Sequence, residues 1–517
     1  AFVGGARLGD LEVVVGPSIL RSVRALRRAA LLRLDGDRYR VLEVLRQALS
    51  HREPEATTTA RAVHRDHFTA VAHQIAAATF GPGRDEARRR FREERANLRA
   101  ALRHARATAP AVADATAVAM DGLASGEVGW RHELEAVRTA QGTAATLPLQ
   151  LALATSLRQD ERIAEADALL ATLAHDAEGI ELGRVLEEQA RCAVVSARPE
   201  RADALVQRAL QGPTDARLRG RLLRSASMLA RRRGDMEQAR VVVAEAIRTL
   251  DAGGCRLEAA LARADAGELL FEIGEAEVAE LELTTAMTML EAEDTPSAMA
   301  SAMQRLGRVL LTRDPPRGRR VLLEAAELAE QTGRRRVGLH ARWRLALVDL
   351  DQGRTADAEE QLRALLQVAR TLGDGVFEAT LWGNLGCAAS DRGDLPAARR
   401  CFEQSLAIGD ESSLFRAWNL MFAGLTELRA GEVEAGRARL EPVVADPDLR
   451  DAPGLCIVAH VLGRPDPPVP TNPIDQAAVA LLSGTATEAQ AARQQSEWLV
   501  RVVGELAKRQ PTGTGSE

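Results

Sequence analysis

ATLWGNLGCAASDRGDLPAARRCFEQSLAI, residues 379–408, contains two runs of helical periodicity separated by a turn. Gly393 lies in that turn, and glycine is the residue that most readily adopts the positive φ found at the end of a helix. Gly386 in the first run and Ala398 in the second are small, so two helix backbones can approach closely where they cross. Phe402 is large enough to fill the space beside the crossing. The stretch therefore predicts a tightly packed helical hairpin.

The same residues resemble the signature of the tetratricopeptide repeat (TPR), a helical hairpin that stacks on copies of itself. The tryptophan, Leu-Gly, small and phenylalanine positions of that signature correspond to Trp382, Leu385-Gly386, Ala398 and Phe402. The resemblance implies an all-α, TPR-like α-solenoid, a right-handed superhelix of helical hairpins. In such arrays the first helix of each hairpin lines a groove that accepts a peptide, a partner domain or a small inducer.

The signature recurs along the chain, and we place the repeat array at residues 149–448. Counting back from Ala398, the equivalent positions of the second helices are 39 or 40 residues apart, and all but one are alanine: Ala358, Arg319, Ala279 and Ala239. The turn positions keep the same phase: Gly393, Gly353, Asp314, Gly274 and Gly234. Weaker copies are predicted near 150–175, 186–211 and 417–446.

Stacking is needed because one amphipathic hairpin cannot bury its apolar face alone, so we expect one continuous core along the array. The copy that contains Arg319 departs from the pattern, since arginine replaces the small residue and Pro315-Pro316 occupies the turn. We therefore predict that this copy packs less tightly than the others. After the array, residues 449–508 are predicted to supply capping helices and residues 509–517 a disordered tail.

The composition favours a helical protein that stays in solution. Apolar residues make up 46% of the chain and charged residues 27%, and the apolar share is mostly Ala, Leu and Val. Alanine and leucine are strong helix formers. The net charge of −5 gives no indication of a nucleic-acid partner. Five scattered cysteines without a CxxC pair favour a reducing compartment, and no apolar run is long enough for a membrane span. We therefore expect a cytoplasmic protein that does not contact a membrane.

Residues 1–50 differ from the repeats. A helix is predicted at about 18–30, and Asp35-Gly36-Asp37 between two apolar runs predicts a β-hairpin. A helix followed by a small hairpin is how a winged-helix domain ends, so we interpret residues 1–50 as a winged-helix remnant. Residues 51–148 are predicted to form a helical linker without repeats. The chain begins with Ala-Phe-Val rather than with methionine, and we expect it to be a fragment of a longer protein.

Three N-terminal segments occur in a recognisable order: Phe2-Val3-Gly4-Gly5, RYRVLEVLRQAL at 38–49 and ERANLRAAL at 94–102. Together they resemble the region that follows the nucleotide-binding domain in large bacterial signal-transducing ATPases of the STAND type, the LuxR-type and antibiotic-regulator proteins. The resemblance implies that this chain is the TPR sensor region of a transcriptional regulator. It also implies that an ATPase domain lies upstream in the full-length protein, and that the winged helix serves the ATPase switch rather than DNA.

Signatures of catalysis are missing from the sequence. A phosphate-binding G-x-x-x-x-G-K-[ST] loop needs a lysine, and the one lysine, Lys508, has no glycine loop before it. His64, His67 and His73 lie close in sequence, but no cysteine or acidic residues are arranged to complete a metal site. We interpret these histidines as an exposed polar helix face. The sequence thus predicts no enzyme, no ATPase within this chain, no metal site and no cofactor.

Three arginine triplets, at 88–90, 231–233 and 334–336, are the remaining candidates for nucleic-acid contact. Each has acidic neighbours and lies near a predicted helix end or turn, so we interpret the triplets as solvated charges. We expect no direct nucleic-acid partner.

The predicted first helices carry polar and aromatic residues that are candidates for a ligand-binding groove: Arg305, Arg308, Trp343, Arg344, Trp382, Asn384 and Trp418. Arginine forks and asparagine amides suit an acidic or carboxylate-bearing ligand. Two other interpretations stay open, because each arginine can be a solvated side chain and each tryptophan can belong to the core between helices.

Two functions follow from these observations. The first is a non-catalytic sensor region that binds a ligand or protein and thereby biases an upstream ATPase switch. The alternative is a free-standing TPR scaffold for protein–protein assembly. A Walker motif in the coding sequence shortly before Ala1 would distinguish the two.

Overall fold

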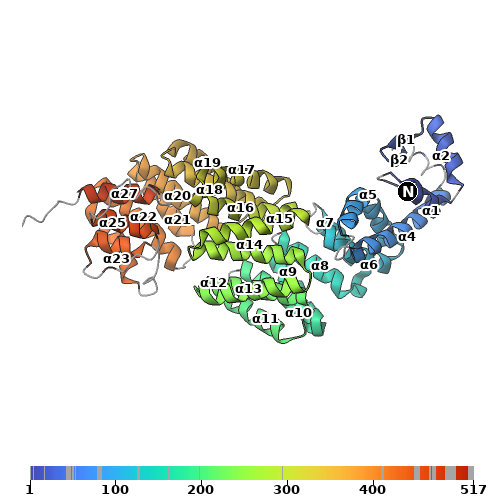
Figure 1. Cartoon of the computed structure of the whole chain (residues 1–517), viewed down its shortest axis with the longest axis horizontal. Helices are drawn as coiled ribbons and strands as arrows, with labels where there is room; N and C mark the ends of the chain where they lie inside the picture. The colour runs from blue at the N-terminus through green and yellow to red at the C-terminus, as the bar shows by residue number, and fades with distance from the viewer. Residues whose placement is uncertain are drawn as a thin grey trace, which may run out of the picture. The chain divides into compact units, whose positions relative to one another are not determined.

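The computed structural model describes residues 2–3, 5–16, 18–41, 48, 52, 54–78, 84–124, 129–160, 162–196, 198–293, 295–408, 413–446, 454–464, 467, 473–483 and 497–509. Within these ranges the chain is all-α apart from one two-stranded sheet near the N-terminus (Figure 1). The chain divides into two compact units, Ala1–Leu269 and Leu270–Glu517. The predicted tail falls outside the described residues from position 510 onward.

The first unit begins with an N-terminal module of residues 2–41, which contains α1 (Leu8–Val15), α2 (Ile19–Arg28), β1 (Leu32–Asp35) and β2 (Arg38–Val41). The two strands pair antiparallel, with Leu32 opposite Val41 and Asp35 opposite Arg38. Gly36 in the connecting turn has φ 59°, a conformation that glycine adopts without strain. The predicted helix and hairpin are therefore confirmed.

Helices without the repeat signature follow the module: α4 (Pro54–Ala78), α5 (Arg84–Thr108), α6 (Pro110–Ala124) and α7 (Trp130–Gln141), with the short 3₁₀ turn η1 (Gly142–Ala144). Pro110 begins α6, where its missing N–H leaves no hydrogen bond unmade. The large side chains buried among these helices include Phe68, Leu98, Met120 and Trp130.

The rest of the first unit consists of helical hairpins: α8 (Leu147–Gln159) with α9 (Ile163–Asp176), α10 (Gly179–Val195) with α11 (Pro199–Gln211), and α12 (Ala216–Arg232) with α13 (Met236–Ala252). The next helix, α14 (Arg256–Glu272), reaches the boundary with the second unit. Side chains cap several of these helices: Thr146, Asp215 and Asp235 each accept a hydrogen bond from a backbone N–H in the first turn.

The second unit continues with α15 (Ala276–Ala292), α16 (Pro296–Arg313), α17 (Pro315–Gln331), α18 (Arg335–Asp351), α19 (Thr355–Thr371), α20 (Gly375–Asp391), α21 (Leu395–Ile408), α22 (Ser413–Ala430) and α23 (Val433–Ala445). The turn glycines Gly274, Gly353 and Gly393 all have φ between 74° and 89°, as the repeat pattern predicts. Even-numbered helices from α8 to α22 are the first helices of their hairpins, and odd-numbered helices from α9 to α23 are the second.

Small residues lie where the two helices of a hairpin cross at close range. A Cβ added to Gly307, Gly386 or Gly424 on a first helix would lie 2.6–2.8 Å from a large side chain of the second helix, namely Leu322, Phe402 or Leu440. Real side chains do not approach so closely, so these first helices need glycine there. On the second helices, Ala239, Ala279, Ala358 and Ala398 are completely buried, which confirms the repeat register at these positions.

The predicted role of Arg319 is wrong. The buried small residue of α17 is the preceding one, Gly318, whereas Arg319 is half-buried and its guanidinium donates to Asp349 at 2.7 Å. A Cβ on Gly318 would lie 2.6 Å from the backbone nitrogen of Leu311, so α16 and α17 cross very closely. Pro315 and Pro316 occupy the first turn of α17 after the N-cap Asp314. This copy therefore does not pack less tightly than the others.

The C-terminal segment folds back on the repeats. It contains α24 (Leu455–Leu462), α25 (Pro473–Leu482) and α27 (Glu497–Arg509). Leu499, Val502 and Val503 of α27 share a buried cluster with Leu350 of α18 and Cys387 of α20. The helix thus packs against first helices of the array as well as against α25.

Candidate functional site

The groove candidates Trp343, Arg344 and Asn384 lie together on the neighbouring first helices α18 and α20. The indole N–H of Trp343 donates to Oδ1 of Asn384 at 2.8 Å. The guanidinium of Arg344 lies 4.3 Å from the centre of the Trp343 ring, within cation–π range. His340 and Phe377 pack edge-on beside them. We call these five residues the aromatic–amide cluster.

The aromatic–amide cluster combines oriented donors with an apolar floor. All its members except the buried Phe377 are half-buried, so part of the cluster faces solvent. Within the described residues, the side-chain NH₂ of Asn384 donates no hydrogen bond, while its Oδ1 is held by Trp343. An amide fixed in this way can present its N–H groups to an acceptor such as a carboxylate or a peptide carbonyl.

The candidates Arg305 and Arg308 lie on α16, the first helix before α18. Arg308 is 4.9 Å from the centre of the Phe271 ring and 3.8 Å from the carboxylate of Glu272. Arg305 occupies on α16 the repeat position that Arg344 occupies on α18. Both arginines are half-buried, so their aliphatic stems are covered and solvent reaches part of each side chain.

Trp382 and Trp418 are placed differently. Trp382 packs in the core cluster between α18, α19 and α20, and Arg370 of α19 lies 5.7 Å from its ring. Residues two apart on a helix point to nearly opposite sides, so Trp382 does not share a face with Asn384. Trp418 lies 5.5 Å from Phe422 and packs against the core of the last hairpins. The structure thus brings together Trp343, Arg344 and Asn384 and leaves these two tryptophans apart from them.

Helix α27 covers another part of the first helices. The guanidinium of Arg429 on α22 binds Glu505 of α27 at 2.7 and 2.9 Å and Asp391 of α20 at 2.8 Å. This fork of ion pairs fixes α27 against the C-terminal ends of α20 and α22. The sequence could not place this contact, because Arg429 and Glu505 are far apart along the chain.

A second cluster, which the sequence analysis missed, lies on the first helices of the first unit. We call it the arginine–glutamate cluster: Arg158 of α8, Glu187, Glu188 and Arg191 of α10, and Arg221 of α12. Arg221 binds both carboxylate oxygens of Glu187, at 2.9 and 2.7 Å, and Arg158 donates to Glu188. Burial alone would raise the pKa of Glu188, but the charges of Arg158 and Arg191 outweigh it and lower that pKa. The available sequence signal was the pair of adjacent acids, Glu187 and Glu188, in the middle of a first helix.

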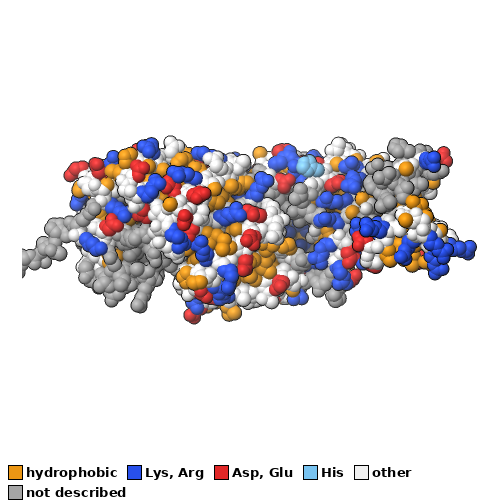
Figure 2. All heavy atoms as spheres, turned by 90° about the horizontal axis from the view of Figure 1, so that it is seen from above, with side chains coloured by type: hydrophobic (Ala, Val, Ile, Leu, Met, Phe, Trp, Pro, Cys, Tyr) orange, Lys and Arg blue, Asp and Glu red, His pale blue; other side chains and the backbone are white. Residues whose placement is uncertain are grey.

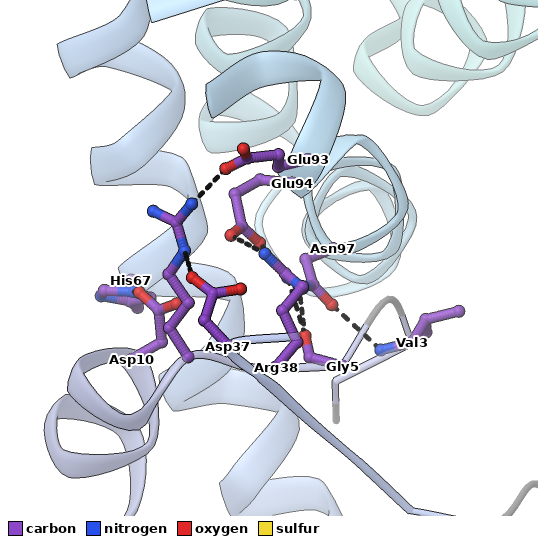
Figure 3. Close-up of polar contacts among 10 residues, drawn as sticks. Val3, Gly5, Asp10, Asp37, Arg38, His67, Glu93, Glu94 and Asn97 are labelled. Carbon is purple, nitrogen blue, oxygen red and sulfur yellow. Dashed lines mark hydrogen bonds and ion pairs between the residues drawn. The ribbon is translucent and has the colours of Figure 1, made fainter. Parts of the chain in front are cut away.

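The N-terminal module is attached to α5 through a buried polar network (Figure 3). Arg38 of β2 binds Glu94 at 2.6 and 2.8 Å and the carbonyl oxygen of Gly5 at 3.0 Å. Asn97 donates to the same Gly5 carbonyl at 2.9 Å and accepts from the N–H of Val3 at 3.0 Å. Burial would raise the pKa of Glu94, but hydrogen bonds from Arg38 and Asn97 lower it. The acid and the amide of the segment at 94–102 therefore both bind the module directly.

The prediction that the N-terminal histidines form an exposed polar face is wrong for His64. This side chain is 2% exposed and lies between Phe2 and Phe68, with ring centres 5.0 and 4.6 Å away. Burial lowers its pKa to about 4, so the ring is neutral near pH 7. His67 instead lies 3.0 Å from Asp10 of α1. Among the described residues, no group of three or more His, Cys, Asp or Glu is arranged to hold a metal ion.

Three further features of the described residues are the surface charge, the hydropathy of the helices and the cysteines. Figure 2 shows basic and acidic side chains interspersed on the face it displays. In the described part of the chain, no helix combines the length and the hydropathy that a membrane crossing requires. All five cysteines lie within the described residues, and none of them forms a disulfide.

Comparisons with known proteins agree with the fold. A tetratricopeptide repeat family model matches residues 339–411. The fold is similar to that of a signal transduction ATPase with numerous domains (STAND) that has a tetratricopeptide repeat sensor, from Pyrococcus horikoshii, at TM-score 0.50 and 11% identity. That match covers 78% of this chain, and this chain spans 60% of the length of the archaeal protein. The structure therefore defines a TPR-like α-solenoid.

Further matches have lower scores. A Rap protein in complex with competence and sporulation factor gives TM-score 0.49 at 13% identity, covering 70% of this chain and 98% of that one. Aspartyl phosphate phosphatase F from Bacillus subtilis gives TM-score 0.38 at 13% identity, covering 74% and 92%. A search of curated protein sequences found no match.

Proposed function

We propose that this chain is the non-catalytic, ligand- or protein-binding TPR sensor region of a STAND-type transcriptional regulator in the cytoplasm. The proposal is supported by the order of the three N-terminal segments, by the TPR repeats that follow them and by a fold similar to that of a STAND protein. The regulator's ATPase domain would lie upstream of residue 1. The first helices of the array would hold a peptide, a protein domain or a small inducer.

The observation that carries the proposal is the aromatic–amide cluster. Its side chains come from α18 and α20, and its half-buried members Arg344 and Asn384 are each reached by solvent in part. Arg305 and Arg308 extend this set of cations onto α16. A ligand with carboxylates or peptide carbonyls would accept hydrogen bonds from the Asn384 amide and from the arginine guanidiniums.

Signal transfer would use the N-terminal junction. The module is fixed to α5 by Arg38, Glu94 and Asn97, so a change in the packing of α4–α7 would move the module as one body. Repeat arrays suit such a role, because each hairpin contacts only its neighbours and small rotations add along the array. A ligand acts only through its different affinity for two such arrangements. The scaffold alternative requires no such coupling and no upstream Walker motif.

Calorimetric titration tests the proposal. An acidic peptide, acetyl-(Glu-Ala)₅-amide, is expected to bind the chain, and an Arg305→Ala/Arg308→Ala variant is expected to bind at least tenfold more weakly. The matched control is Arg320→Ala/Arg363→Ala, which removes the same charge from the exposed faces of second helices and should change affinity less than twofold. Equal affinity in the Arg305/Arg308 variant and the control contradicts the proposed groove.

A further inference from the structure

The arginine–glutamate cluster contains more positive than negative charge. Arg158, Arg191 and Arg221 supply three cations, whereas Glu187 and Glu188 supply two anions. Both carboxylates are almost completely buried, with side-chain exposures of 1% and 2%. Arg221 and Arg158 each have one carboxylate as a close partner. The unmatched cation is Arg191.

Arg191 is held less closely than its neighbours. Its guanidinium nitrogens lie 3.3 Å from Glu187 and 3.7 Å from Glu188, and it makes no hydrogen bond within the described residues. A guanidinium has five N–H donors, and leaving them unpaired in a dense environment is costly.

The environment of Arg191 is enclosed but still open to solvent. Burial is the largest influence on this residue and lowers its pKa, while 32% of its side chain remains exposed. Arg221, the closest arginine on the next first helix, is 28% exposed. Arg191 and Arg221 are therefore partly covered by protein and partly reached by solvent, whereas the two carboxylates that they contact are buried.

We propose that Arg191, together with Arg221 and Arg158, binds a single carboxylate group of a ligand. One carboxylate would bring the cluster to electrical neutrality, with three cations and three anions. It would also accept the N–H groups that Arg191 does not use, in the bidentate geometry that guanidinium favours. A phosphate dianion would leave an excess negative charge above two buried carboxylates, so the site should prefer a carboxylate.

The carboxylate can belong to an acidic protein segment or to a free organic acid, and the chemistry at Arg191 is the same for both. The site lies in the first unit, whereas the aromatic–amide cluster and Arg305 lie in the second. This proposal rests on the proposed binding function and names a ligand class for it. Arg191→Gln tests the site in the first unit, whereas Arg305→Ala/Arg308→Ala tests the site in the second unit.

Calorimetry with three probes at constant ionic strength tests the proposal: acetyl-(Glu-Ala)₅-amide, succinate and inorganic phosphate. We expect at least one carboxylate probe to bind more tightly than phosphate. Binding of the peptide alone identifies an acidic segment as the ligand type, and binding of succinate identifies a free acid. In a chain that also carries Arg305→Ala/Arg308→Ala, so that the peptide site proposed in the second unit is removed, Arg191→Gln should weaken the remaining carboxylate binding at least tenfold, which is about 1.4 kcal/mol. Absence of carboxylate binding, or tighter binding of phosphate, overturns the proposal.

Two further variants separate binding from folding. Arg184→Gln lies on the same helix, removes the same charge from a more exposed position and should change affinity less than twofold. Glu188→Gln raises the net charge of the cluster and should tighten carboxylate binding several-fold. Arg191→Gln leaves two arginines with two glutamates, so its thermal midpoint should equal or exceed that of the unmodified chain. A lower midpoint together with unchanged affinity would mean that Arg191 is structural, and the proposal would be wrong.

Discussion

Replacing Gly318 by alanine should destabilise the second unit, because this glycine lets α16 and α17 cross at close range. The added Cβ would lie 2.6 Å from the backbone nitrogen of Leu311 and 2.9 Å from the carbonyl carbon of Leu310. Ordinary contacts of a Cβ begin at about 3.4 Å, so the helices must separate by about 0.8 Å. Backbone atoms cannot rotate away, and overpacking of this kind costs about 1–3 kcal/mol.

Gly338→Ala is the matched control. Gly338 is also a buried helical glycine, but a Cβ there would meet Ala329 at 3.5 Å, an ordinary contact. Alanine gains up to about 1 kcal/mol over glycine in a helix, and this gain largely cancels between the two variants. In urea unfolding followed by circular dichroism, the free energy of unfolding of Gly318→Ala should therefore be about 1–3 kcal/mol lower than that of Gly338→Ala. Equal stability of the two variants would mean that α16 and α17 do not cross closely at Gly318, and the repeat register would be wrong.

Three further predictions concern the ends of the chain. Arg38→Ala leaves the Glu94 carboxylate buried without its cation, so attachment of the N-terminal module should weaken by about 3–5 kcal/mol. Amide hydrogen exchange in residues 5–41 should accelerate. Unchanged exchange would contradict the claim that Arg38 and Glu94 fix the module to α5. Burial lowers the pKa of His64 to about 4 from an ordinary value of 6.5, so the unfolded chain binds more protons between these pH values. The free energy of unfolding should then fall by about 2 kcal/mol between pH 7.5 and pH 5 because of His64. His64→Phe should remove that part of the pH dependence in urea titrations. If the free energy of unfolding of the variant depends on pH as strongly as that of the unmodified chain, the buried neutral ring is contradicted. Glu505→Ala removes a bidentate ion pair that is partly exposed, which is a loss of about 1 kcal/mol, so exchange in α27 should rise about fivefold; no change would mean that α27 is held by apolar contacts alone.

Much of the fold was predictable because its determinants are local. Helical periodicity, turn glycines such as Gly353 and Gly393, and small residues such as Ala398 act within one hairpin, so their spacing specifies each hairpin directly. The misplacement of Arg319 shows the limit of this reasoning. A glycine and an arginine are adjacent there, the repeat step is not constant, and only the crossing of two helices distinguishes which of them is buried.

The candidate sites were less predictable, because they depend on contacts between distant segments. His64 is buried against Phe2, which lies far from it in sequence. Helical spacing places His64 on the apolar stripe of Phe68 and Val71, a signal that the sequence analysis missed. The arginine–glutamate cluster needs three first helices in register before its charges meet. Both Trp343 and Asn384 were candidates on the predicted first helices, and the stacking of α18 on α20 places them within hydrogen-bond distance.

Hydrogen exchange of the chain with and without acetyl-(Glu-Ala)₅-amide tests the central claim most directly, namely that the first helices of the array form the binding surface. The peptide should slow exchange in residues 296–313, 335–351 and 375–391, which are first helices. The adjoining second helices, residues 315–331 and 355–371, should change little. Protection confined to these second helices, or no protection in any helix of the array, would contradict the claim.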